Sequence, residues 1–157
     1  LERPNGIVFG SEKDILYVSN CIPGKFELNK YQLKTSKNND VSLKLLDKYD
    51  DKWIYKNIKN NEISPLCSDT NDNDYIMDSG CVDGFTIHKK GYIITSCPCQ
   101  KICVLNEKNG ELLGVITMPA NTKVSNLEII NDDHLFITGN FSIWKIQLQT
   151  NDNNSDL

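Results

Sequence analysis

The chain has 157 residues, enough for one compact domain, and its 17 basic and 21 acidic residues give a net charge of -4. This mildly acidic balance, without a basic stripe, argues against nucleic-acid binding. No apolar run approaches the roughly 20 residues that a membrane span needs, so we expect no membrane segment. No signal peptide is visible. The chain begins at Leu1 rather than Met, which we interpret as the start of a fragment or a processed product.

The redox state of the cysteines indicates the cellular compartment of the protein. The six cysteines are Cys21, Cys67, Cys81, Cys97, Cys99 and Cys103. The spacing of the last three does not follow the paired C-x2-4-C units of structural zinc sites. We therefore interpret the cysteines as reduced, half-buried residues of a cytoplasmic protein. Disulfides and a structural metal are the alternatives.

Short apolar stretches separated by polar turns follow one another along the chain, without a long 3.6-residue periodicity. The first group of expected strands comprises residues 6–9, 15–18, 25–34 and 41–46. Apolar alternation slips near Asn29 and Lys30 in the third of these, which predicts a bulge. A helix is an alternative at residues 43–58, where the residues close to helical spacing are Leu45, Leu46, Tyr49 and Trp53.

Two further groups of strands follow. Their expected members are residues 84–88, 92–96, 102–106 and 112–117, and then 127–130, 135–138 and 142–149. Lys89 to Gly91 forms the first turn of the second group, and Asn109-Gly110 is a hairpin signal between its last two strands. The pattern is that of an all-β protein.

The three groups open alike, with "RPNGIVF", "CVDGFTI" and "VSNLEII". Each resembles one blade of a β-propeller, and three blades make about half of a ring. The blades are expected at residues 1–46, 82–119 and 124–149. An Asn/Asp/Lys-rich insertion is expected at about 47–80 and a disordered tail at 150–157.

A polar residue stands at the mouth of the first strand in every group: Asn5, Asp83 and Asn126. First strands line the central channel of a propeller, so we expect these side chains to converge. Carboxylate and amide oxygens suit Ca²⁺ or Mg²⁺, and the glycines that follow Asn5 and Asp83 would permit tight turns. Asn-Gly and Asp-Gly are also ordinary turn residues, which is the alternative.

Two long segments, "RPNGIVFGSEKDILYVSN" and residues 82–148 with their D-G, "GELLGVITMP" and "SIWKIQL" motifs, resemble the gluconolactonase/regucalcin (senescence marker protein) family. The resemblance implies an all-β fold of the six-bladed β-propeller family, of which this chain covers roughly three blades. It also implies a divalent metal, Ca²⁺ above all with Zn²⁺ or Mg²⁺ possible, and a small-molecule lactone or ester substrate.

By that resemblance, Asn5 and Asp83 are metal ligands, Asp83 is also the catalytic base, and Asn126 is a possible channel residue. The implied reaction is hydrolysis of sugar lactones, in which the metal polarises the carbonyl that water attacks. The family's glutamate ligand precedes P-N-G and has no counterpart here, because Glu2 and Glu12 are poorly placed. The fragment alone is therefore expected to bind metal weakly and to be inactive.

Two other functions stay open: a non-catalytic propeller that serves as a binding scaffold, and a related metal-dependent arylester or phosphotriester hydrolase. His88, at a strand end, and His134, in a turn, are expected to face solvent rather than to act as ligands or bases. A serine hydrolase lacks support, since neither Ser96 nor Ser142 has a nearby His-Asp pattern.

Overall fold

The structure, a computed structural model of the chain, describes residues 1–22, 26–50, 82–97, 101–119 and 122–149. Within these ranges, antiparallel strands form three sheets. The first has the order β1 (Pro4–Phe9), β2 (Ile15–Asn20), β3 (Glu27–Thr35), β4 (Val41–Asp50). The second has the order β5 (Phe85–His88), β6 (Tyr92–Cys97), β7 (Lys101–Asn106), β8 (Leu112–Thr117). The third consists of β9 (Val124–Ile130), β10 (His134–Gly139) and β11 (Ser142–Gln147).

The alternation of apolar residues explains why these segments are strands. Successive side chains of a strand point to opposite faces, so period-two patterning places one face in the core. In β10, Leu135 and Ile137 are fully buried while the residues between and beside them are partly exposed. Across the same ranges, no helix is long and apolar enough to cross a membrane.

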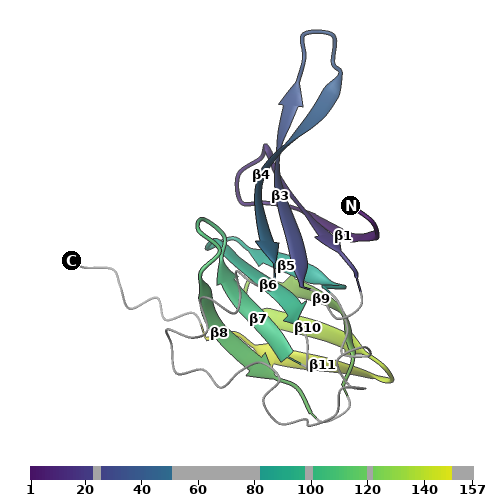
Figure 1. Cartoon of the computed structure of the whole chain (residues 1–157). Coiled ribbons are helices and arrows are strands. Elements are labelled where there is room, and N and C mark those ends of the chain that lie inside the picture. Colours follow the sequence, from purple (N-terminus) through teal and green to yellow (C-terminus); the bar gives the residue numbers. More distant parts are fainter. Residues whose placement is uncertain (23–25, 51–81, 98–100, 120–121, 150–157) are drawn as a thin grey trace, which may run out of the picture.

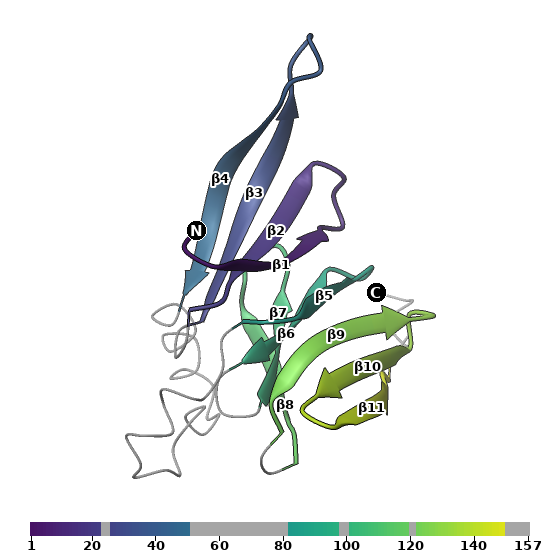
Figure 2. The ribbon, with the colours of Figure 1, turned by 90° about the vertical axis from the view of Figure 1, so that its right-hand side faces the viewer.

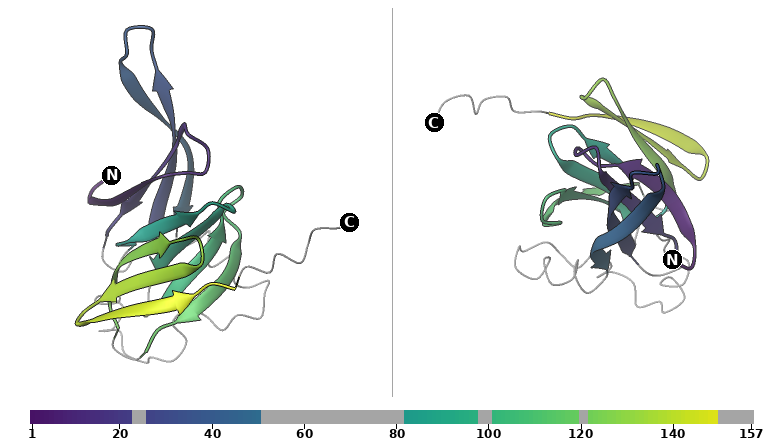
Figure 3. Two further views of the ribbon diagram at one scale, coloured as in Figure 1. Left: turned by 180° about the vertical axis from the view of Figure 1, so that it is seen from behind. Right: turned by 90° about the horizontal axis from the view of Figure 1, so that it is seen from above.

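The sheets lie side by side as three blades, which we call blade 1 (β1–β4), blade 2 (β5–β8) and blade 3 (β9–β11) (Figures 1 and 2). The first strand of blade 2, β5, contacts the first strands of the other two, β1 and β9. These three inner strands are therefore neighbours, as in a propeller. Blade 3 has three strands in the described residues, with β11 at its outer edge (Figure 3).

Two hydrophobic clusters join the blades, and blade 2 contributes to both. In the first cluster, Tyr17 of blade 1 is buried together with Ile93 of blade 2. In the second, Ile102 of blade 2 is buried together with Leu135 of blade 3. Each blade boundary is therefore a packed apolar layer, as expected for sheets stacked face to face.

A buried glutamate fixes blade 1 against blade 2. Glu107, in the turn after β7, is 5% exposed. Its Oε1 accepts a hydrogen bond from the backbone N–H of Ser11 at 2.8 Å, and its carbonyl oxygen accepts one from the Tyr17 hydroxyl at 3.1 Å. These bonds connect β2 and the turn before it to a turn of blade 2, so they help to set the position of blade 1 relative to blade 2.

The β3–β4 hairpin projects beyond the rest of the molecule (Figure 1). The pairing register shifts beside the predicted position, between Lys30 and Tyr31, but the extra residue is Leu46 of β4, so the bulge lies in the partner strand rather than in β3. The alternative of a helix is wrong for residues 43–50, which belong to β4; Tyr49 pairs with Leu28 and is buried. Residues 51–80 of the predicted insertion, Trp53 among them, and the predicted tail 150–157 lie outside the described residues.

The cysteine prediction is wrong where the structure describes it. Cys97 at the end of β6 and Cys103 in β7 form a disulfide. Cys103 lies opposite Thr95, so Cys97, two positions further along the same face, meets it diagonally across the two strands. Cys21 is disulfide-bonded as well, and no cysteine is free in the described ranges. The cytoplasmic location rested on reduced cysteines and loses that support.

Glycines of two kinds shape the blades. Gly91 and Gly110 have φ values of 79° and 73° in the turns after β5 and β7, where a side chain would be strained. Gly6 and Gly84 are not among the positive-φ residues, so the expected tight turns are not their role. A Cβ on Gly84 would lie 2.4 Å from the Cα of Asn126. Gly84 is required because β9 passes against the start of β5.

We expect Gly84→Ala to destabilise the fold by about 1–3 kcal/mol, because backbone atoms of β9 occupy the space that the new methyl group needs. Gly114→Ala is the matched control: it lies in β8 with nothing within 4 Å of the added Cβ. Its stability should be unchanged or up to about 1 kcal/mol higher. Urea unfolding compares the two variants. Equal stabilities would contradict the close approach of β5 and β9.

Candidate functional site

The inner strands begin at one end of the channel, and we define the mouth site there as Asn5, Asp83, Ser125 and Asn126. Asn5 is the second residue of β1, Asp83 stands two residues before β5, and Ser125 and Asn126 follow the first residue of β9. Asp83 is half-buried, whereas the other three are exposed. The polar residues at the starts of the three first strands therefore come from three different blades to one end of the channel.

The structure brings Asn5 and Asp83 into direct contact although 78 residues separate them in the sequence. The side-chain amide of Asn5 donates a hydrogen bond through Nδ2 to Oδ1 of Asp83. Asn126 makes no such bond: its Oδ1 accepts one from the backbone N–H of Leu127 at 2.9 Å. Asn126 instead lies against Gly84, the residue that follows Asp83.

Two buried serines hold the backbone around Asp83. The Ser96 hydroxyl accepts a hydrogen bond from the Asp83 N–H at 3.0 Å and donates one to the carbonyl of Gly84 at 3.2 Å. The Ser19 hydroxyl accepts from the N–H of Gly6 at 2.7 Å and lies 3.3 Å from the carbonyl of Asp83. Asp83 is thus fixed by second strands of two blades, which pre-organises its carboxylate.

A third hydroxyl occupies the same place in blade 3, where the Thr138 Oγ1 lies 3.4 Å from the carbonyl of Asn126. In the strand register, Ser96 lies opposite Gly84, and Thr138 lies opposite Asn126. Asn126 is therefore equivalent to Gly84, and Ser125 is the counterpart of Asp83. The repeat phase assigned to Asn126 from the sequence is one residue off.

Sequence reasoning missed these hydroxyls, although a signal for them exists. The second strands begin "ILYVS", "YIITS" and "HLFIT", with a hydroxyl at the fifth position each time. A Ser or Thr at one fixed position of an otherwise apolar strand predicts a buried hydroxyl with a backbone partner. Aligning the groups on this position would have placed Ser125, rather than Asn126, beside Asp83.

Burial dominates the electrostatics of Asp83. Desolvation raises the pKa of its carboxyl above the ordinary value, and the hydrogen bond from Asn5 opposes that rise. A carboxylate that is expensive to ionise is a favourable partner for a cation, since a nearby positive charge relieves the same desolvation. The Asp83 carboxyl therefore holds a proton to a higher pH than an ordinary aspartate does.

The mouth site fits part of the divalent-metal site that the family resemblance implies. A half-turn of the Asn5 amide would place its oxygen beside the Asp83 carboxylate, and a hard cation would stabilise that arrangement. Ca²⁺ takes about 6–8 oxygen ligands, more than one carboxylate and a few amide oxygens supply. Throughout the described ranges, no three His, Cys, Asp or Glu side chains gather as a metal-binding group.

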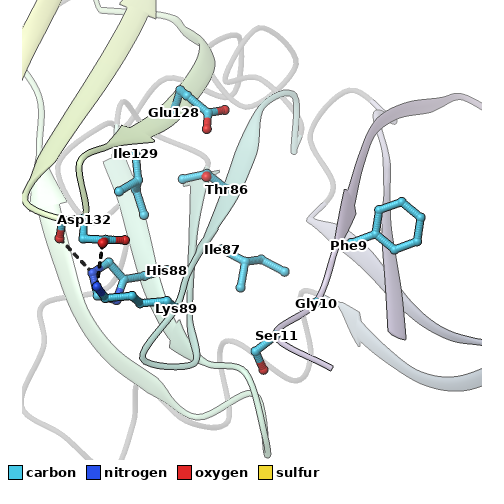
Figure 4. Close-up of a pocket in the computed structure, with 10 residues that line it drawn as sticks. All are labelled: Phe9, Gly10, Ser11, Thr86, Ile87, His88, Lys89, Glu128, Ile129 and Asp132. Carbon is cyan, nitrogen blue, oxygen red and sulfur yellow. Dashed lines mark hydrogen bonds and ion pairs between the residues drawn. The ribbon is translucent and has the colours of Figure 1, made fainter. Parts of the chain in front are cut away.

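The inner strands end around an open pocket of about 260 Å³ at the other end of the channel (Figure 4). Phe9 comes from β1, Thr86 and His88 from β5, and Glu128 from β9. Asp132, in the turn after β9, closes one side: its carboxylate pairs with Lys89 at 2.5 Å. This pocket was not foreseen from the sequence.

The expectation that His88 faces solvent is wrong, because the side chain is 2% exposed. Its Nδ1 accepts a hydrogen bond from the backbone N–H of Lys90 at 3.1 Å, so the ring proton lies on Nε2, which donates to the carbonyl of Asp132 at 2.9 Å. Both ring nitrogens are engaged, which gives His88 a structural role. His134 is partly buried, and its Nδ1 lies 2.5 Å from Asp133 Oδ1.

No protein-family model matches the chain, and no curated protein matches its sequence. Among solved structures, the β-propeller domain of Myceliophteria thermophila Cps50 (Swd1) is similar with a TM-score of 0.59 and 10% identity, over 93% of this chain and 41% of that one. KlHsv2 with loop 6CD replaced by a Gly-Ser linker gives a TM-score of 0.50 and 12% identity, over 95% of this chain and 36% of that one.

These likenesses show the fold and nothing of the chemistry, since identity is so low. The predicted all-β propeller fold, with roughly three blades in this chain, is confirmed. The chain spans about two fifths of the length of the Cps50 (Swd1) propeller domain.

The raised pKa of Asp83 predicts a pH-dependent effect of Asp83→Asn. The folded chain holds this proton more tightly than the unfolded chain, so wild-type stability falls as pH rises from the ordinary aspartate pKa through the raised one. Asp83→Asn has no charge to bury at any of these pH values, so it does not lose stability as pH rises. Its side-chain oxygen can still accept the hydrogen bond from Asn5. We expect it to be more stable than wild type at pH 7, with the difference vanishing below about pH 4.

Thermal unfolding at a series of pH values measures this effect. Asp40→Asn, at the exposed tip of the β3–β4 hairpin, is the control for the loss of one negative charge. If Asp83→Asn proves less stable than wild type at pH 7, the carboxylate is stabilising and the desolvation argument is wrong.

Proposed function

We propose that this chain is part of a non-catalytic β-propeller scaffold, and that it binds a further β-sheet layer through the open face of blade 1. The open face consists of Ile7, Phe9, Val41, Leu43 and Leu45. These five apolar side chains are between 51% and 65% exposed. Their exposure on one side of a sheet is the observation that carries the proposal.

Strand register places these side chains together. Phe9 pairs with Leu16, Leu16 with Tyr31, and Tyr31 with Leu45, which gives one apolar row across the four strands. Directly paired residues of antiparallel strands point to the same face. Ile7 lies two positions from Phe9 on β1, so it belongs to that face as well.

The opposite face of blade 1 already packs on blade 2 through Tyr17 and Leu28. Blade 1 thus carries apolar side chains on both faces, which is the pattern of a sheet with a neighbour on each side. Burying a side chain of the size of Phe9 or Ile7 stabilises by roughly 1.5–3 kcal/mol. A contiguous exposed apolar patch on a folded protein usually marks an interaction site.

The shape of the open face favours one kind of partner. A twisted sheet face is covered best by another sheet at about 10 Å, as blade 2 covers the other side. A propeller blade outside this chain's three, on the same or another polypeptide, has that shape. A lactone or other small molecule could not cover five side chains spread over β1 and β4.

A photo-reactive phenylalanine analogue in place of Phe9, in the complete protein, tests this proposal. We expect cross-links from position 9 to a β-strand outside residues 1–149, identified by peptide mass spectrometry. The same analogue at Leu113, which is 46% exposed in β8 of the central blade, is the control and should give few such cross-links. Equal yields at positions 9 and 113 would exclude the open face as a specific interface.

A second candidate is the metal-dependent lactone hydrolase of the gluconolactonase family, and the contact between Asn5 and Asp83 favours it. These side chains would hold a divalent cation that polarises the substrate carbonyl, with Asp83 as the base. The arylester or phosphotriester hydrolase would use the same groups. Neither enzyme depends on the open face, so variants of the two surfaces separate the candidates.

If the hydrolase is correct, the complete reading frame hydrolyses glucono-lactone in the presence of Ca²⁺ or Zn²⁺, and Asp83→Asn lowers the rate at least about 100-fold. Asp132→Asn, at the far end of the channel, serves as the control and should retain activity. Background rates in a folded wild-type protein with either metal would count against the lactonase function. The non-catalytic scaffold would then remain as the proposed function.

A further inference from the structure

The disulfides indicate the kind of cellular compartment in which the chain folds. Cys97 and Cys103 are 6% and 0% exposed, and their bond links neighbouring strands of blade 2. Cys21, which follows the last residue of β2, is disulfide-bonded too. Structural disulfides form and persist in oxidising compartments and are rare where thioredoxin and glutathione keep thiols reduced. A buried pair between two core strands is of the structural kind.

A second and independent observation concerns the turn between β10 and β11. Its sequence, Asn140-Phe141-Ser142, has the N-x-S form of an N-glycosylation acceptor, with no proline in the middle. All three residues are exposed, and Phe141 is 102% exposed. Acceptor sequences that receive glycans lie on such surface turns.

Two hydrogen bonds between Asn140 and Lys123 are compatible with a glycan. Oδ1 of Asn140 accepts from the backbone N–H of Lys123 at 3.0 Å, and the Asn140 N–H donates to the Lys123 carbonyl at 3.3 Å. A glycan attaches through Nδ2, so both bonds can remain in the modified protein. The amide is thereby held in a turn whose three residues are exposed.

We propose that Asn140 carries an N-linked glycan and that the chain folds in an oxidising, glycosylating compartment. In the transfer, a bond forms between Nδ2 and the anomeric carbon of a lipid-linked oligosaccharide pyrophosphate. The bond from that carbon to the pyrophosphate oxygen breaks, the pyrophosphate leaves with the electron pair, and the amide loses one proton. For the disulfide, two thiols pass two electrons and two protons to the disulfide of an oxidoreductase.

This modification has a consequence for the mouth site. The β10–β11 turn follows the end of β10, and Thr138 near that end pairs with Asn126 of the mouth site. The glycan would therefore stand on the mouth end of blade 3, away from the open face of blade 1. It would restrict which molecules approach the channel there, while the open face stays accessible to another sheet.

The complete protein isolated from its native cells tests the proposal. Peptide N-glycosidase converts a glycosylated asparagine to aspartate, so we expect aspartate at position 140 by mass spectrometry after treatment, and asparagine at this position to be lost. A non-reduced digest should contain the Cys97 and Cys103 peptides joined. Unmodified Asn140, or Cys97 and Cys103 recovered as alkylated thiols, would overturn the proposal.

Variants of the complete reading frame, expressed in the same cells, assign the glycan to this turn. Ser142→Ala leaves the Asn140 contacts with Lys123 in place and should lose one glycan, seen as a shift in electrophoretic mobility. Ser142→Thr preserves the acceptor form and should retain it. Asn153→Gln removes a second N-x-S sequence, which lies outside the described residues, and should leave the glycan at Asn140. A mobility unchanged by Ser142→Ala would overturn the assignment.

Discussion

The close approach of the inner strands is the constraint on which the rest of the structure depends. At Gly84, the backbone of β9 occupies the place where a Cβ would stand, so β5 and β9 lie nearly in backbone contact. At Gly6, the available space is limited in the same way by Phe85 and by the carbonyl of Asp83. Backbone polar groups brought so close need partners, and the buried hydroxyls of the second strands supply them. The mouth site is a product of this packing.

The candidate functional features of the molecule lie in two separate places. The mouth site, the disulfide of blade 2 and the proposed glycan all belong to the ends where first strands begin and second strands end. The open face belongs to the outer side of blade 1, where its apolar side chains border a polar row that contains Asn29 and Lys48. A scaffold function and a channel function would therefore use separate surfaces of one fold, and a change at either surface leaves the other intact.

Local patterning made the strands predictable, because period-two alternation and turn residues depend on neighbours in sequence. The approach of Asn5 to Asp83 was predictable for another reason, since both stand at the start of the first strand of a repeated unit. The alignment of Asn126 with Asp83 was wrong because residue type alone suggested it. The structural equivalent of Asp83 in blade 3 is the preceding residue, Ser125. His88 lies at a strand end, where sequence suggests solvent, yet the turn after β9 covers it. Nor does cysteine spacing reveal whether two thiols are oxidised, because that depends on how strands pair.

Blade 2 is a shared partner, because its residues complete both hydrophobic clusters. In stacked repeats, stability is close to the sum of the repeats' own stabilities and of the interfaces between neighbours. A central repeat is therefore stabilised by two interfaces and each terminal repeat by one. Opening blade 1 or blade 3 breaks one interface, whereas opening blade 2 breaks both. Amide protons of β6 and β7 should therefore exchange with solvent last, and those of β11 and of the projecting hairpin first. The order in which the chain loosens follows from the order in which its blades are stacked.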